Sequence, residues 1–145
     1  MKGETCIWTI GHSNRSIQTF IELMREYSIE VVVDVRKFPT SKIEHFKRKQ
    51  MERWLQKYSL KYVWLGEELG GYRKGGYKNY MRTKPFKEGI EHLVKISKKR
   101  RVCIMCMETN PKYCHRKFIS QYLERKGVKV FHILKKGQNS LTTLL

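Results

Sequence analysis

The sequence predicts an α/β fold: a three-layer domain whose five-stranded, mostly parallel sheet carries helices on both faces. Five short runs of apolar and β-branched residues alternate along the 145 residues with segments whose apolar side chains recur at helical spacing. The run from Ile29 to Val35 is also rich in β-branched residues, as in strands buried on both faces of a parallel sheet. Strands and helices that alternate in this way form parallel sheets through right-handed crossovers.

The first half of the chain predicts three strands and two helices. Ser16 is placed to cap the first helix, and Pro39 prevents the second strand from continuing. In order, we expect a strand at Cys6–Ile10, a helix through Ile17, Phe20, Ile21 and Met24, a strand at Ile29–Val35, a helix through Met51, Trp54, Leu55 and Tyr58, and a strand at Lys61–Leu65.

The second half begins with the least regular part of the chain, residues 66–84. Five glycines are interleaved there with tyrosines, which predicts a mobile loop with a functional role. Pro85 suits the first turn of the next helix, and Gly127 suits the position after the last one. We expect a helix through Phe86, Ile90, Leu93 and Val94, a strand at Val102–Met107, a helix through Phe118, Ile119, Tyr122 and Leu123, a strand at Val128–Leu134, and a flexible tail at 135–145.

Residues 1–145 are thus predicted to form one domain, with the Rossmann-like strand order 3-2-1-4-5. Strands one and four are neighbours in that order. Ligands of such sheets bind at the carboxyl ends of the strands, where the strand order switches direction. That edge would bring Gly11-His12-Ser13 against the segment 105–116, with Asp34 and Arg36 beside them. We therefore predict a binding cleft there.

The composition is that of a strongly basic globular protein. Lys and Arg number 31 against 13 for Asp and Glu, a net charge of +18, while 40% of the residues are hydrophobic and 12% aromatic. Lys-rich surfaces of hyperthermophile proteins are balanced by Glu, and this chain is not. The excess favours a polyanionic partner, such as nucleic acid or a phosphate-containing small molecule. No run is long enough for a membrane span and no signal peptide is evident, so we expect a cytoplasmic protein without a membrane partner.

An ordered set of short motifs runs through the chain. These are Thr9-Ile10-Gly11-His12-Ser13, Asp34-Val35-Arg36 with Pro39 and Ser41, Leu69-Gly70-Gly71, and Cys106-x-Glu108 with Pro111 and Cys114-His115-Arg116. In this order they resemble the DUF488 family of small α/β proteins. Because that family has no settled activity, the resemblance implies a fold and a site but no reaction.

Four residues are candidates for catalysis: Cys114, Cys106, Glu108 and His12. Cys114 is expected in the first turn of a helix among cationic neighbours, where a thiol readily loses its proton; a half-buried packing role is the alternative. Cys106 ends an apolar strand, which favours a structural role over that of a nucleophile. Glu108 is a candidate general base, or else the ion-pair partner of an arginine. His12 is a candidate for proton transfer, or else is locked by hydrogen bonds to its turn.

A second group is expected to bind anions. Arg36 and Arg116 would clamp a phosphate or carboxylate together with helix N-terminal amides, aided by His115 and Ser13, although Ser13 more simply caps a helix. Asp34 and Gly11 are assigned structural roles, since a carboxylate inside an apolar strand needs a partner.

The glycine-rich loop is the third candidate region. Its aromatic and basic residues suit stacked bases and phosphates, unless the tyrosines fold back onto the core. These residues are Tyr72, Arg73, Lys74, Tyr77 and Lys78. The cysteine spacing does not match a structural zinc site, so no metal and no cofactor are expected.

The functional hypothesis is an enzyme, a hydrolase or transferase, that acts on nucleic acid or a nucleotide. The alternatives are a nucleic-acid-binding module without catalysis and a thiol-based redox or anion sensor.

Overall fold

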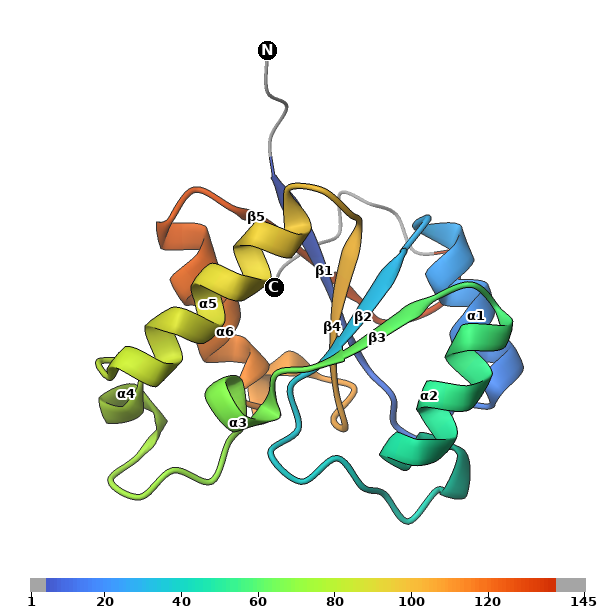
Figure 1. Cartoon of the computed structure of the whole chain (residues 1–145), viewed down its shortest axis with the longest axis horizontal. Coiled ribbons are helices and arrows are strands. Elements are labelled where there is room, and N and C mark those ends of the chain that lie inside the picture. Colours follow the sequence, from blue (N-terminus) through green and yellow to red (C-terminus); the bar gives the residue numbers. More distant parts are fainter. Residues whose placement is uncertain (1–4, 138–145) are drawn as a thin grey trace.

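The computed structural model describes residues 5–137, which form a parallel sheet between two helical layers (Figure 1). The sheet order is β3-β2-β4-β1-β5, and all neighbouring strands are parallel. The strands are β1 (Cys6–Gly11), β2 (Val31–Asp34), β3 (Lys61–Trp64), β4 (Val102–Cys106) and β5 (Lys129–Ile133).

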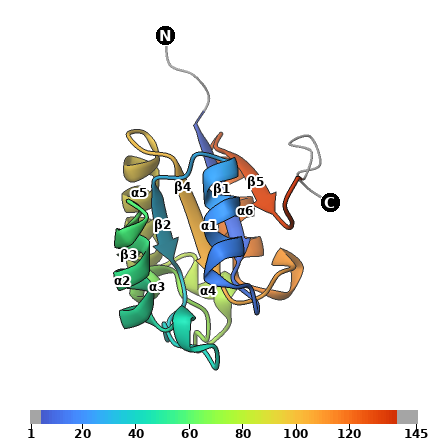
Figure 2. The same cartoon turned by 90° about the vertical axis from the view of Figure 1, so that its right-hand side faces the viewer.

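Helices cover both faces of this sheet, as Figures 1 and 2 show. One face carries α1 (Ile17–Glu26) and α2 (Arg48–Lys57), and the other carries α5 (Lys84–Ser97) and α6 (Arg116–Arg125). Four short helices lie in the connections: η1 (Glu44–Phe46), α3 (Gly66–Leu69), α4 (Tyr77–Tyr80) and η2 (Pro111–Tyr113).

The hydrophobic core has two halves because successive strand residues point to opposite faces. Along β2, Val32 packs under α1 and α2, whereas Val31 and Val33 pack under α5 and α6. Along β4, Cys103 belongs to the first half and Cys106 to the second. Cys106 therefore faces the α6 side, where the segment after β4 returns to the sheet.

The predicted α/β class, the five strands and the helices on both faces are confirmed, but the predicted strand order is wrong. β4 lies between β2 and β1, so the order is 3-2-4-1-5 and not 3-2-1-4-5. The expected contact between the first and fourth strands does exist. The strands β1, β2 and β4 are all buried apolar runs, so each suits an interior position in the sheet. The hydrophobic pattern therefore cannot decide the order in which these three strands lie.

Helix boundaries agree with the local signals. The Ser16 hydroxyl accepts a hydrogen bond from the amide of Thr19 as the cap of α1, and Gly127 follows α6 in the left-handed conformation with φ 87°. Pro85 lies in the first turn of α5.

The segment 66–84 is more regular than expected, because it contains α3 and α4. The hydroxyls of Tyr77 and Tyr80 donate to the main-chain oxygens of Leu69 and Glu68, at 2.6 and 2.7 Å. These bonds satisfy carbonyls that a helix as short as α3 leaves without partners.

Most of the predicted flexible tail, residues 138–145, lies outside the described residues. Within 5–137, none of the helices has the length and apolar character needed to cross a membrane.

Candidate functional site

A cavity of about 840 Å³ opens at the carboxyl ends of β2, β3 and β4, and we call it the cleft. Its walls come from the segments that follow these three strands, at 36–40, 71–77 and 106–118. The chain leaves β2 toward one face of the sheet and leaves the neighbouring β3 and β4 toward the other. Connections that diverge in this way create a crevice, which is the usual ligand site of an open parallel sheet.

Two cysteines form part of the cleft wall. Cys106 is the last residue of β4, and Cys114 lies between η2 and α6. Their Sγ atoms are in direct contact and are paired as a disulfide, so each residue carries a thiol only in the reduced form. Cys114 does not lie inside the helix as expected, since α6 begins at Arg116, but its sulfur accepts the main-chain N–H of Arg116 at 3.5 Å. The thiol is therefore held at a helix N-terminus, where a negative charge is stabilised.

His115 is oriented toward the Cys114 thiol by a distant part of the chain. Its Nε2 donates to the main-chain oxygen of Val35 at 2.8 Å, which leaves the Nδ1 lone pair 3.7 Å from the Cys114 sulfur. Burial lowers the pKa of His115, so the ring is neutral near pH 7 and able to accept a proton. This arrangement, a thiol next to an oriented base, is the minimum needed to activate a nucleophile.

Glu108 is exposed and faces the cleft. Within the described part of the chain its carboxylate has no hydrogen bond or ion pair, so the expected pairing with Arg36 or Arg116 is not formed. Three lysines also line the cleft, Lys37, Lys112 and Lys117, and among residues 5–137 none of them has a carboxylate partner. The cleft therefore carries a net positive charge.

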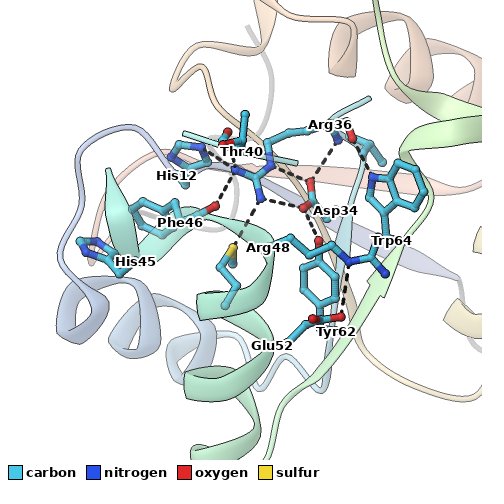
Figure 3. A network of polar contacts seen from close by, with 12 residues as sticks. His12, Asp34, Arg36, Thr40, His45, Phe46, Arg48, Glu52, Tyr62 and Trp64 are labelled. Atoms are coloured by element: carbon cyan, nitrogen blue, oxygen red, sulfur yellow. Dashed lines mark hydrogen bonds and ion pairs between the residues drawn. The ribbon is translucent and has the colours of Figure 1, made fainter. Parts of the chain in front are cut away.

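The Arg36 guanidinium is used in hydrogen bonds within the protein, as Figure 3 shows. Its guanidinium pairs with Asp34 through both oxygens at 2.9 and 2.7 Å, and donates to the main-chain oxygens of Thr40 and Phe46 at 3.2 and 2.8 Å. Asp34 is fully buried and also accepts the Tyr62 hydroxyl at 2.5 Å. The partner expected for Asp34 is thus Arg36, and the pair holds the segment between β2 and η1.

The Arg116 guanidinium also forms its hydrogen bonds with protein atoms. It is completely buried, and its guanidinium donates to Thr9 Oγ1 at 2.9 Å and to the main-chain oxygens of Glu108 and Thr109. Burial lowers its pKa to about 10, which keeps it charged at neutral pH. Most donors of Arg36 and Arg116 are used inside the protein, and Arg116 does not line the cleft, so the two arginines do not face it together as the predicted anion clamp requires. Among the described residues, Arg116 Nε is buried without a hydrogen-bond partner.

His12 is buried rather than exposed at the strand end. Its Nδ1 lies 2.8 Å from the main-chain oxygen of Ser13, its Nε2 lies 3.3 Å from the Arg36 guanidinium, and its ring stacks on Phe46 at 4.3 Å. Burial lowers its pKa to about 4, so it is neutral and locked. Neither His12 nor Ser13 contributes to the cleft wall, and the cap of α1 is Ser16, not Ser13.

Gly11 has the structural role assigned to it. A Cβ at this position would lie 1.7 Å from the main-chain oxygen of Glu108, because the segment after β4 crosses directly over the end of β1. The same crossing lets the amide of Ser13 donate to the main-chain oxygen of Met107 at 2.9 Å.

Two exposed aromatic rings stand at the cleft, one of which the sequence did not single out. Phe38 is 62% exposed and Tyr72 is 83% exposed, and their ring centroids are 6.0 Å apart. The available signal for Phe38 was an aromatic residue in a basic segment just after a buried strand. Tyr72 has φ 59°, a conformation that bulky residues adopt at a cost.

Of the other predicted loop residues, two line the cleft and two do not. Arg73 and Tyr77 line the cleft, but Arg73 donates to the main-chain oxygens of Gly70, Gly66 and Glu67, and Tyr77 stacks on Phe118. Lys74 and Lys78 are exposed and are not part of the cleft wall. Of the predicted loop residues, Tyr72 alone has a side chain both exposed and at the cleft.

No cluster of three or more His, Cys, Asp or Glu side chains that could hold a metal ion occurs within residues 5–137. A search of curated proteins and a search of solved structures each returned no match. The model of a family described as "Domain of unknown function DUF488" matches residues 16–123, which is more than half of the chain. The chain therefore belongs to the DUF488 family.

Proposed function

We propose that this protein is an enzyme that binds nucleic acid or a nucleotide in the cleft, as a transferase or hydrolase. The observation that carries the proposal is the exposed pair Phe38 and Tyr72 beside lysines for which residues 5–137 provide no carboxylate partner. A nucleotide presents both a flat aromatic base and a negative phosphate, so these two features of the cleft would be used together.

The aromatic pair suits base stacking. Exposed rings this large leave much apolar surface in water, and a base that stacks on them would cover it. The left-handed backbone of Tyr72, at φ 59°, is unfavourable for an L-residue and is of the kind that clusters at functional sites. Stacking on aromatic side chains tolerates any base, so the proposal extends to single strands of mixed sequence.

The lysines suit the phosphates. The Lys37 ammonium lies 5.8 Å from the Phe38 ring centroid, and the Lys117 ammonium lies 4.9 Å from the Phe118 ring centroid. Cations next to rings are the arrangement that single-strand-binding surfaces use for alternating bases and phosphates. The net charge of +18 would add long-range attraction for a polyanion.

The catalytic groups of the proposal are Cys114 as nucleophile and His115 as its base. His115 takes the place of His12, which is buried and locked. Glu108 faces the same cavity and would supply a second group for proton transfer. Cys106 is in contact with Cys114 and has no role in this reaction.

Binding is tested with fluorescently labelled single strands of DNA and RNA, by anisotropy at low and rising salt. We expect binding that weakens as salt rises, because phosphate contacts release counterions. The double variant Phe38→Ala/Tyr72→Ala should bind roughly tenfold or more weakly, since a stacked base contributes about 1–3 kcal/mol. Tyr58→Ala is the matched control, an exposed tyrosine just after α2 that does not line the cleft.

Absence of binding at low salt, or equal affinities for the double variant and the control, would refute the proposed ligand. Catalysis is tested separately by mass spectrometry of the bound strand or nucleotide. A ligand that stays chemically unchanged with the wild type would favour the non-catalytic binding module. Turnover that is lost in Cys114→Ser would support the enzyme.

A further inference from the structure

We propose that Cys106 and Cys114 form a dithiol–disulfide couple that exchanges with disulfides carrying negative charge. Cys114 is the attacking thiol and Cys106 the resolving one. The inference shares Cys114 with the proposed function but does not depend on a nucleotide.

The first support is the direct contact of the two sulfur atoms. The cysteines are eight residues apart, one at the end of β4 and the other just before α6. Their Cα atoms are 7.7 Å apart. This is about 1 Å beyond the usual span of a disulfide.

The two thiols differ in access, which assigns their roles. Cys106 is only 2% exposed, whereas Cys114 is half-buried, and both belong to the cleft wall. A reagent that enters the cleft therefore reaches Cys114 first. Cys106 is placed to attack only a sulfur that is already bonded to Cys114.

The surroundings activate Cys114. His115 Nδ1 lies 3.7 Å from its sulfur, and the amide of Arg116 donates to it from the first residue of α6. A basic neighbour and a helix N-terminus both favour the thiolate, which is the attacking form. Lys112 and Lys117, which also line the cleft, would attract a disulfide that carries carboxylates.

The second thiol indicates the kind of electrophile. Attack of Cys114 on the carbon or phosphorus of a nucleotide, as in the proposed function, does not use Cys106, so the second thiol points to a further kind of electrophile. If Cys114 attacks a disulfide, its sulfur becomes part of a mixed disulfide with the reagent. Cys106, in contact with that sulfur, can then attack it and break the mixed disulfide.

The exchange runs in two balanced steps. The Cys114 thiolate attacks a disulfide RS–SR, forms Cys114–S–SR and releases the thiolate RS⁻. Cys106 then loses its proton and attacks the Cys114 sulfur, which forms the Cys106–Cys114 disulfide and releases the second RS⁻. The two cysteines are oxidised by two electrons, and the external disulfide is reduced to two thiolates. An external dithiol such as dithiothreitol reverses both steps.

The remaining cysteines serve as internal controls. Cys103 is completely buried in β4, and burial raises the pKa of its thiol. Cys6 is partly buried at the start of β1 and does not line the cleft. Neither is placed to take part in the exchange.

The test uses 5,5′-dithiobis(2-nitrobenzoate), an aromatic disulfide with two carboxylates, on the reduced full-length protein at neutral pH. We expect the wild type to release two equivalents of the coloured thiolate, and the second release should be independent of reagent concentration. The product should be lighter than the reduced protein by two hydrogens, with Cys106 and Cys114 in one cross-linked peptide. Cys106→Ser should release one equivalent rapidly and keep the adduct on Cys114, so that release of a second equivalent is roughly tenfold or more slower than in the wild type.

Cys114→Ser should lose the fast first phase, and Cys6→Ser, the matched control, should behave as the wild type does. The inference is overturned if the wild type retains the adduct on Cys114, or if Cys106→Ser releases its second equivalent at the wild-type rate. Urea unfolding of each variant establishes that the serine proteins are folded. No nucleotide is present in this assay, so its failure is distinguishable from failure of the proposed function.

Discussion

Replacement of Arg36 by alanine tests the reasoning about the buried ion pair most directly. The Arg36 side chain is 6% exposed and Asp34 is fully buried, with 2.7 Å between Nη2 and Oδ2. Arg36→Ala would leave the Asp34 carboxylate in the core with the Tyr62 hydroxyl as its remaining side-chain donor. Removal of one member of a buried pair costs about 3–5 kcal/mol, because the other charge stays buried and uncompensated. The free energy of unfolding of a domain is only about 5–15 kcal/mol, so this is a large fraction of it.

The matched control is the ion pair Arg48–Glu52 on α2. Its atoms are 3.4 Å apart, but both side chains are at least 40% exposed. Exposed pairs four residues apart on a helix contribute about 0.3–0.5 kcal/mol. The Arg48 guanidinium also lies 5.0 Å from the Trp64 ring centroid, a contact that adds about 0.5–1 kcal/mol at an exposed site, so Arg48→Ala should still cost much less than Arg36→Ala. Urea unfolding followed by circular dichroism measures both. For a slope near 2 kcal/mol per molar, Arg36→Ala should lower the midpoint by roughly 2 M.

The reasoning fails if Arg36→Ala costs no more than Arg48→Ala. A second variant distinguishes a buried charge from simple loss of packing. The double replacement Asp34→Asn/Arg36→Met removes both charges, so it should be less destabilising than Arg36→Ala alone. If the double variant is instead the less stable of the two, the uncompensated charge is not the cause.

Two further predictions concern stability. His132 in β5 is buried, with its Nδ1 2.6 Å from Thr9 Oγ1. Burial lowers the pKa of both His12 and His132 from 6.5 to about 4, so the folded protein binds fewer protons than the unfolded chain between these values. The stabilisation by the neutral rings is therefore fully present above pH 6.5 and is lost as the pH falls toward 4, by about 3 kcal/mol for each histidine. Urea unfolding midpoints at a series of pH values and NMR titration of the two rings measure this loss. Titration of either ring near pH 6.5 would contradict the prediction. Gly11→Ala should lower the melting temperature more than Gly127→Ala, because a Cβ at Gly11 meets main-chain atoms whereas one at Gly127 meets only an unfavourable φ of 87°; the opposite order would show that the crossing over β1 gives way easily.

The edge of the sheet where the cleft opens could be predicted because it depends on few assumptions, but the wall expected at Gly11-His12-Ser13 is formed instead by residues 36–40 and 71–77. Any parallel sheet that contains these strands gathers their carboxyl ends on one edge. Cys106, Glu108 and Cys114 do line one cavity there, although the assumed strand order was wrong. The strands β1 and β4 are adjacent in both the expected and the observed strand order.

The roles of the two histidines could not be predicted from their neighbours in the chain. His12 follows a strand and has a glycine before it, which suggested an accessible ring, but η1 brings Phe46 against it. His115 was expected only to bind anions, yet the main-chain oxygen of Val35, 80 residues away, orients its free nitrogen toward Cys114. Both outcomes depend on contacts between distant segments.

The sequence alone determined the α/β class, the places of the five strands and of the helices α1, α2, α5 and α6, and the edge of the sheet where the cleft opens. These follow from apolar periodicity and from capping residues such as Ser16 and Gly127, which act within a few residues of the chain. The tertiary structure decided the strand order, the withdrawal of Arg36 and Arg116 into the interior, and the pairing of Phe38 with Tyr72. Each of these depends on which distant side chains compete for the same space and the same hydrogen bonds, and that competition exists only once the layers have packed.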